Sequence, residues 1–288
     1  FKGKIPIWFR GDSTLLDPTS SLKNFIKTRY LKWVYRHVDL AFYVGLNNRN
    51  YFKKYGLKEH QLVFAPHAID NERFAIRQPD QTAQFRARLG IPEREILILF
   101  AGKFEPKKNP LLLLQAFTEL NAANTHLLFV GNGPLEAELK NKAVQFNQSE
   151  NQQINKSTNQ SHIHFLPFQN QSQMPIIYQA ADLFCLPSKG PGETWGLSVN
   201  EAMACGKAIL VSDKVGCATD LVKPYQNGLI FKSENLPHLI ENLKHLTLCK
   251  AQLEAYGQKS REIIQDWNFE ALIFNIEKHL NHEPQRQN

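Results

Sequence analysis

The chain has 288 residues, of which 42% are hydrophobic and 21% are charged, close to the average of soluble globular proteins. This length corresponds to about two domains, and no run approaches the roughly 18 apolar residues that suggest a membrane-spanning helix. The net charge of +7, from 34 basic and 27 acidic side chains, favours a partner with phosphate groups, such as a nucleotide, a nucleic acid or an anionic membrane. Because the basic residues are spread along the chain, a nucleic acid is the least favoured of these partners.

The four cysteines are Cys185, Cys205, Cys217 and Cys249. They include no CxxC pair and have no histidine at metal-ligand spacing. This pattern argues against a structural zinc site and against a disulfide framework. We therefore expect free thiols in a reducing cytoplasm.

The first 70 residues alternate between short apolar runs and helical patterns. The chain opens without Met and without the apolar stretch of a signal peptide, and we expect further sequence upstream in the natural protein. A polar connector at 66–74 marks a candidate domain boundary. The elements predicted before it are strands at 5–9, 40–45 and 61–65 and helices at about 20–36 and 47–55.

The helix predicted at about 20–36 has two interpretations. Leu22, Phe25 or Ile26, Arg29 and Trp33 fall on one stripe at helical spacing. The favoured interpretation packs this stripe on the sheet and leaves the cations solvated. In the alternative, the basic and aromatic residues of 23–37 suit an anionic membrane surface.

From residue 96 onward, strand and helix patterns alternate regularly. This rhythm predicts a parallel sheet wrapped by helices, and in such sheets ligands bind at the carboxyl ends of the strands. The stretch 147–161 is rich in Asn, Gln and Ser and is predicted to be a solvated loop. The predicted strands are 96–102, 126–133, 162–168, 182–188, 207–213 and 228–231.

The segment 187–210 carries the strongest chemical signal. A helix is predicted to begin near Gly196 or Leu197, where free backbone N–H groups can bind a phosphate. Glu193 precedes this helix and Glu201 lies about one turn inside it, so the two carboxylates suit hydroxyl groups on either side of a bound diphosphate. The spacing of the two glutamates alone favours a plainer interpretation, in which one is a loop charge and the other a solvated helix residue.

Two segments resemble one enzyme family. ETWGLSVNEAMACGKAIL (193–210) resembles the E-x7-E segment of the retaining family-4, or group 1, glycosyltransferases of GT-B fold. FAGKFEPKKNPLLLLQAF (100–117) resembles the G-[RK]-x4-K segment of the same family. RGDSTLL (10–16) and YVGLNNRNYFKKYG (43–56) further resemble the bacterial branch that builds surface polysaccharides.

The resemblance runs from about Pro6 to the C-terminus and implies an α/β fold with two Rossmann-like parallel-sheet domains. Residues 1–70 would be the remnant of the N-terminal, acceptor-side domain, which would lack about 100 residues. Residues 71–265 would form the C-terminal nucleotide-sugar-binding domain. Residues 266–288 would form a helix that crosses back to the first domain.

The resemblance also implies individual roles. Lys103 and Lys108 match the cations that bind the donor's diphosphate, and the competing interpretation is an exposed basic turn that also contains Lys107. Glu193 matches a catalytic glutamate near the transferred sugar, and Glu201 matches the one on the ribose. The further donor-binding positions are Gly102, Phe168 (near the base), Thr194, Gly196 and Leu197.

One position departs from the family pattern. Family members often carry a histidine at the end of the strand that corresponds to residues 5–9. At that place this chain has Arg10-Gly11-Asp12. Arg10 or Asp12 is the candidate catalytic substitute, and the alternative is that Asp12 begins a turn. Four histidines, His37, His60, His67 and His126, lack a partner motif and are assigned connector or surface roles.

The implied function is transfer of a sugar, with retention, from a nucleotide-diphosphate-sugar to a glycan or lipid-linked glycan. The resemblance to GT-B enzymes implies that no metal or other cofactor is needed, and the sequence has no DxD between strands. The expected location is the cytoplasm, and peripheral contact with the inner face of the membrane is the alternative that the basic and aromatic residues of 23–37 leave open. The alternative is a donor-sugar-binding module without turnover, because the first domain is truncated. A dehydrogenase is disfavoured by the lack of G-x-G-x-x-G after the first strand of either half, and a GT-B epimerase is a minor option.

Overall fold

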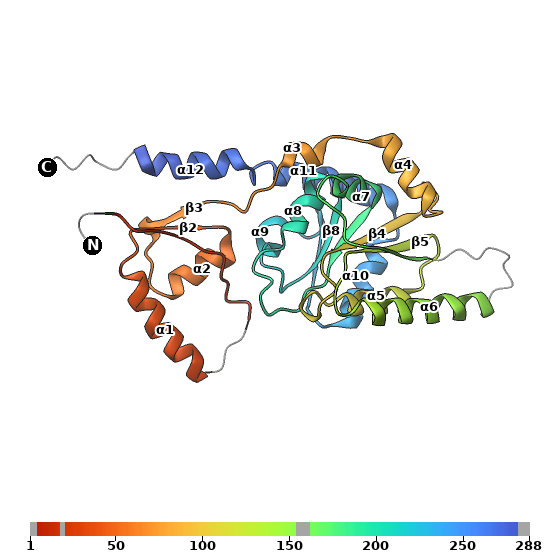
Figure 1. Cartoon of the computed structure of the whole chain (residues 1–288), viewed down its shortest axis with the longest axis horizontal. Helices are drawn as coiled ribbons and strands as arrows, with labels where there is room; N and C mark the ends of the chain where they lie inside the picture. Colours follow the sequence, from red (N-terminus) through yellow and green to blue (C-terminus); the bar gives the residue numbers. More distant parts are fainter. Residues whose placement is uncertain (1–4, 18–20, 154–161, 282–288) are drawn as a thin grey trace. The chain divides into compact units, whose positions relative to one another are not determined.

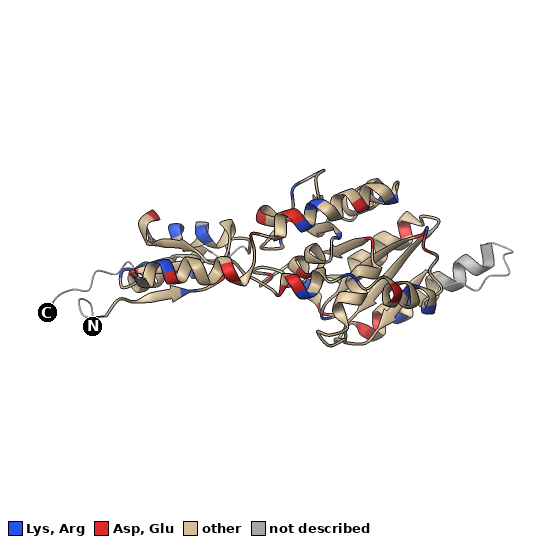
Figure 2. Ribbon diagram, turned by 90° about the horizontal axis from the view of Figure 1, so that it is seen from above, with Lys and Arg blue, Asp and Glu red and all other residues tan. Residues whose placement is uncertain are grey.

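The computed structural model describes residues 5–17, 21–153 and 162–281, with the backbone alone over 147–153 and at 281. The chain divides into two compact units, one of Phe1–Asp70 with Asp266–Asn288 and the other of Asn71–Gln265. Each unit is built on its own parallel sheet (Figure 1). Acidic and basic residues are interspersed along the ribbon of both units (Figure 2).

The smaller unit has three parallel strands in the order β1-β2-β3. Its elements are β1 (Trp8–Arg10), α1 (Ser21–Tyr35), β2 (Leu40–Tyr43), α2 (Leu46–Lys54), η1 (Glu59–Gln61), β3 (Leu62–Phe64) and α12 (Phe269–Asn281). Helices α1 and α2 pack on one face of the sheet around Tyr35, Tyr51 and Phe52, and α12 packs on the other face against Phe42 and Val63 (Figure 1). Apolar side chains on both faces therefore hold this short sheet.

Helix α1 turns a different face to the sheet from the one predicted. The rings of Phe9 and Phe52 pack on Tyr35, and Leu31 and Val34 join the same core. This aromatic contact selects the Tyr35 face over the competing apolar stripe, so the prediction that the stripe packs on the sheet was wrong. The stripe is exposed, at 70% for Leu22, 60% for Phe25, 60% for Ile26 and 58% for Trp33.

The larger unit has six parallel strands in the order β6-β5-β4-β7-β8-β9. The strands are β4 (Ile96–Ala101), β5 (Thr125–Val130), β6 (Ile163–Leu166), β7 (Leu183–Leu186), β8 (Ala208–Ser212) and β9 (Gly228–Phe231). Every residue of β4, β5, β7 and β8 is buried, as expected for a sheet covered on both faces. From β4 the chain proceeds outward through β5 and β6, then returns to β7 on the other side of β4. The strand order thus reverses between β4 and β7, the usual position of a ligand site in such folds.

Helices cover both faces of the six-stranded sheet. They are α3 (Asn71–Ala75), α4 (Pro79–Arg88), η2 (Pro106–Lys108), α5 (Pro110–Leu120), α6 (Glu136–Gln153), α7 (Met174–Ala180), α8 (Leu197–Ala204), α9 (Ala218–Leu221), α10 (Leu236–Leu246) and α11 (Lys250–Ile264). Helix α5 packs with α6 and α10, and α8 packs with α7 and α11 (Figure 1). Within the described ranges, no helix combines the length and apolar character needed to cross a bilayer.

Helix α6 extends further than the sequence predicted. The predicted loop 147–161 is helical as far as Gln153, and residues 154–161 lie outside the described part of the chain. Ion pairs between Glu136 and Lys140 and between Glu138 and Lys142 support the start of this helix at i,i+4 spacing. A polar sequence can therefore continue a helix whose first turns are already formed.

Candidate active site

The loops that follow β4 and β7 meet at the carboxyl edge of the six-stranded sheet. Strands β4 and β7 are direct neighbours, and their register pairs Leu99 with Phe184. After β4 the chain continues through Gly102 and Lys103 into η2, and after β7 it forms the long loop that precedes α8. The two segments that carry the family resemblance therefore lie side by side.

Lys108 and Glu193 form an ion pair between these two loops. The Lys108 Nζ atom lies 2.6 Å from Glu193 Oε2, and the Ser188 hydroxyl donates a hydrogen bond to the same oxygen at 2.9 Å. The Glu193 side chain is only 7% exposed and that of Lys108 16%. A carboxylate this deeply buried requires such partners, since removing one leaves an uncompensated charge. Ser188, which sequence reasoning missed, is fully buried.

Glycines shape the loop at the start of α8. Gly196 occupies the N-cap with φ of 100°, and a Cβ there would lie 2.9 Å from Val215 Cγ1. Gly216 packs so closely that an added Cβ would overlap the carbonyl oxygen of Thr194. No side-chain hydrogen bond caps the described start of this helix, and the Val199 N–H donates to the Gly196 carbonyl oxygen at 2.9 Å. The N–H groups of Leu197 and Ser198 in the first turn can therefore bind an anion.

Glu201 lies one turn into α8 and accepts two hydrogen bonds. The Tyr178 hydroxyl donates to Oε2 at 2.8 Å, and the Gln171 side-chain amide donates to Oε1 at 3.2 Å. Arg73 in turn donates to Gln171 Oε1 at 3.0 Å. Burial raises the pKa of Glu201, and the two hydrogen bonds oppose this rise. Hydrogen bonds from Tyr178 and Gln171 thus fix the Glu201 carboxylate, so it is not the solvated helix residue of the plainer interpretation.

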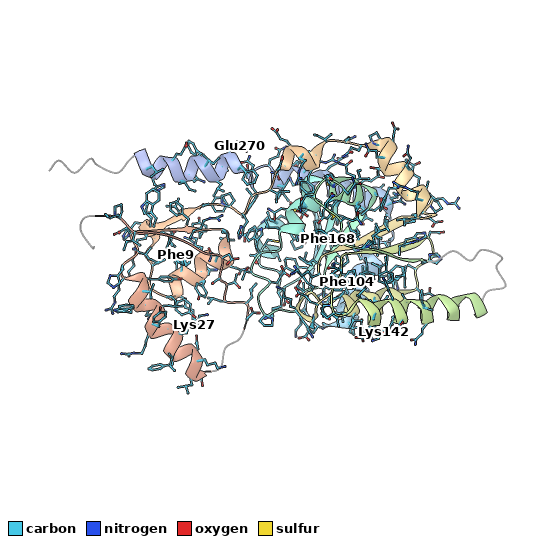
Figure 3. All side chains as sticks on the ribbon, in the orientation of Figure 1. Phe9, Lys27, Phe104, Lys142, Phe168 and Glu270 are labelled. Carbon is cyan, nitrogen blue, oxygen red and sulfur yellow. The ribbon has the colours of Figure 1, made fainter. Side chains whose placement is uncertain are left out.

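A cavity of about 250 Å³ opens beside Glu201. Its lining includes Gly102, Lys103, Gly131, Phe168 and Glu201. Phe168 follows β6 and is 70% exposed, and Lys103 is also exposed. Phe168 is labelled in Figure 3. A Cβ added at Gly131 would overlap the carbonyl oxygen of Gly102, so only glycine allows the two loops to lie this close.

The structure assembles most of the predicted donor-site residues on this edge and adds residues that sequence reasoning missed. Lys107 stands apart, with its ammonium group 3.5 Å from Glu105 and its side chain 40% exposed. The turn Gly131-Asn132-Gly133 after β5 was the available signal for part of the cavity wall. Gln171 and Tyr178 gave no comparable signal, because each contacts Glu201 from another segment of the chain.

The two other predicted residues, Arg10 and Asp12, belong to the three-stranded unit. Arg10 donates hydrogen bonds to the carbonyl oxygens of Ala65 and Pro66 at 3.4 and 3.3 Å. Asp12 Oδ2 lies 3.9 Å from His67 Nε2. His67 lies in the connector that follows β3, as the sequence indicated, and the parallel order of β1, β2 and β3 brings it beside Asp12.

Comparison with known proteins assigns the family. Residues 81–263 match the model of the family described as glycosyl transferases group 1, and this range is more than half of the chain. The chain belongs to the group 1 glycosyl transferases. It is 28% identical over 221 residues to D-inositol 3-phosphate glycosyltransferase of Rhodococcus jostii, an alignment that covers 76% of this chain and 46% of that protein. Lipopolysaccharide 1,2-N-acetylglucosaminetransferase of Salmonella typhimurium is 29% identical over 198 residues, which cover 63% of this chain and 51% of that protein.

The chain spans about half the length of these two curated relatives. Among solved structures, Anabaena Alr3699/HepE in complex with UDP matches with a TM-score of 0.79 at 17% identity, and covers 96% of this chain and 72% of that chain. The same protein in complex with UDP-glucose matches with a TM-score of 0.73 at 18% identity and the same coverage. These matches show the fold, and the predicted α/β fold of GT-B type with two parallel sheets is confirmed.

Proposed function

We propose that this protein transfers a sugar, with retention, from a nucleotide-diphosphate-sugar to a glycan or lipid-linked glycan acceptor. The observation that carries the proposal is the carboxyl edge of the six-stranded sheet, where Lys108 pairs with Glu193 and Glu201 borders a cavity. Cations, free helix N–H groups and two held carboxylates suit a ligand with phosphates flanked by hydroxyl-bearing sugars. UDP and UDP-glucose in the complexes of Anabaena HepE are ligands of this class.

In this proposal the diphosphate binds to Lys103, Lys108 and the first turn of α8. Glu201 accepts hydrogen bonds from the ribose, replacing or rearranging the bond from Gln171. The exposed ring of Phe168 offers the nucleotide base an apolar surface at the rim of the cavity. Gly102 and Thr194 contribute backbone that lies close to the phosphates.

The chemistry follows from this charge arrangement. As the bond between the sugar's anomeric carbon and the donor phosphate breaks, the electron pair leaves with the nucleoside diphosphate, whose negative charge increases. Lys108 and the positive end of α8 stabilise that charge, and no metal ion is invoked in this step. Glu193 is the carboxylate next to Lys108 and accepts hydrogen bonds from the transferred sugar. The acceptor oxygen forms the new bond on the same face, and the proton of the acceptor hydroxyl passes to an oxygen of the departing donor phosphate.

The test is a donor titration followed by a turnover assay. We expect calorimetry to show saturable binding of UDP, and UDP-glucose to release UDP when an acceptor glycan is added. Saturable UDP binding without any sugar transfer across an acceptor panel would favour the second candidate, a donor-sugar-binding module.

We also propose that α1 contacts an anionic membrane on the cytoplasmic side, where a lipid-linked acceptor would lie. Its sequence contains no Asp or Glu, and Lys23, Arg29 and Lys32 are exposed on it. Tyr30 and Trp33, 62% and 58% exposed, are residue types that suit the interface between water and lipid. Lys27 turns inward, with Nζ lying 5.0 Å from the centre of the Tyr51 ring (Figure 3).

A further inference from the structure

Asp12 and His67 come together at the carboxyl edge of the three-stranded sheet. Asp12 lies just after β1 and His67 just after β3, on strands that run parallel and flank β2. The Asp12 Oδ2 and His67 Nε2 atoms are 3.9 Å apart. The side chains are 47% and 23% exposed, so a solute can reach both.

Arg10 holds the segment that carries His67. Its guanidinium donates hydrogen bonds to the carbonyl oxygens of Ala65 and Pro66, which directly precede His67. These bonds fix the backbone at the end of β3 and hold the imidazole near Asp12. Arg10 is therefore a positioning residue.

His67 is held in its neutral form near neutral pH. Burial lowers its pKa most, the charge of Arg10 lowers it further, and the charge of Asp12 acts in the opposite direction. A neutral imidazole nitrogen can donate or accept one hydrogen bond, depending on its tautomer. The Asp12 carboxylate can only accept hydrogen bonds when it is ionised.

The separation of the two atoms suits one inserted hydroxyl group. At 3.9 Å the nitrogen and the oxygen are too far apart for a direct hydrogen bond. An oxygen atom placed about 2.8 Å from each of them would subtend an angle of roughly 90°, which a hydroxyl group accommodates. That hydroxyl would donate its proton to the carboxylate and accept a hydrogen bond from the imidazole N–H.

We propose that Asp12 and His67 bind one hydroxyl group of a sugar, as part of the acceptor site of this protein. The inference rests on the proposed function, because it makes that sugar the acceptor. It adds His67 as a residue that binds the acceptor. It also names the chemical class of the bound group, which is a vicinal or primary hydroxyl of a saccharide. It also accounts for Arg10-Gly11-Asp12, the departure from the family pattern.

The experiment uses the whole chain with ¹⁵N-labelled histidine and follows the imidazole signals by NMR. The probes are the methyl α-glycosides of glucose, galactose, mannose and N-acetylglucosamine, each titrated into the millimolar range. The His67 signal, assigned with a His67→Gln variant, is expected to shift saturably with at least one probe. In Asp12→Ala the half-saturation concentration should rise at least about tenfold, the effect of one lost hydrogen bond to a charged group.

Two controls separate this inference from the proposed function. His60, exposed in η1 of the same unit, should not respond to any probe, and His60→Gln should leave the His67 shift unchanged. UDP binding, measured by calorimetry, should be the same in Asp12→Ala and the wild type. A His67 signal that no glycoside moves, with UDP still bound, overturns the hydroxyl site and leaves the proposed function standing. Glycoside binding at His67 without any UDP binding would support the hydroxyl site and contradict the proposed function.

Discussion

The ammonium group of Lys108 lies 2.6 Å from the carboxylate of Glu193, across two loops that follow neighbouring strands of the larger sheet. Strands β4 and β7 are separated in sequence by two further strands, but they are adjacent in space. The pair therefore depends on the reversal of strand order at this point. It links the two segments that resemble the donor-binding motifs of group 1 glycosyltransferases.

Replacing Lys108 by alanine should weaken UDP binding by roughly 1.5–3 kcal/mol, because a charge-assisted bond is lost. It should also lower the free energy of unfolding by about 1–3 kcal/mol, since Glu193 would remain buried with one partner fewer. Lys103→Ala should weaken UDP binding but leave the free energy of unfolding unchanged, because the Lys103 side chain is exposed. Calorimetry and urea unfolding measure the two effects. Lys107→Ala is the matched control, and an equal loss of affinity in this variant would remove Lys108 from the phosphate site.

Glu201→Gln and Glu193→Gln should affect different steps. Glu201→Gln replaces an acceptor-only group with an amide and should weaken UDP binding by about 1.5–3 kcal/mol. Glu193→Gln should leave UDP affinity within about twofold and lower kcat for sugar transfer, because its partner is the reacting sugar. Steady-state kinetics with UDP-glucose would separate the two. If both variants changed kcat and UDP affinity alike, the division of roles would be refuted.

The larger unit should lose stability in mild acid because of a histidine cluster. His164 Nε2 lies 3.1 Å from His126 Nδ1, and burial, followed by the charges of His126 and His162, lowers the pKa of His164 to about 4. A lowered pKa in the folded state means that stability is complete above the unfolded value of about 6.5 and is lost as the pH falls toward 4. The loss reaches up to about 3 kcal/mol at the lowest pH.

His164→Asn should flatten that pH dependence in urea-unfolding experiments between about pH 7 and pH 4. The exposed His60→Asn serves as the control and should keep the wild-type slope. An unchanged slope in His164→Asn would mean that other groups cause the acid sensitivity.

The exposed face of α1 should bind anionic vesicles at low salt. Phe25→Ser with Trp33→Ser should reduce the bound fraction in flotation assays, and Lys23→Gln with Arg29→Gln should reduce it further, by about 1 kcal/mol per charge. Phe274→Ser on α12 is the matched control, since Phe274 is also exposed, at 65%. Equal binding to anionic and neutral vesicles would rule out this face as the membrane contact. Undiminished binding of the Phe25→Ser/Trp33→Ser variant would do the same.

The sequence predicts the larger unit well because its signals are local. Continuous apolar runs such as Ile96–Ala101 identify buried strands, and Gly196 marks the start of α8. Parallel order then places every following loop on one edge, so Lys108 and Glu193 are predicted to lie in one site before their contact is known. The contacts of Glu201 with Gln171 and Tyr178 carry no local pattern, because they join three separate segments.

The smaller unit is less predictable for two physical reasons. Helix α1 has apolar residues around much of its surface, so spacing alone does not select its packed face, and the Tyr35 contact with Phe52 decides it. The pairing of Asp12 with His67 depends on the order of three strands whose turns contain no common motif. Both features follow from tertiary packing rather than from periodicity.

The most direct test of the central claim is a calorimetric titration of UDP into the wild-type chain and into the Lys108→Ala/Glu201→Gln double variant. The diphosphate site at the carboxyl edge of the six-stranded sheet predicts saturable one-to-one binding to the wild type. It also predicts at least about a hundredfold weaker binding to the double variant, because two bonds to charged groups are lost. Absence of saturable UDP binding to the wild type, or equal affinity of the two proteins, would contradict the claim.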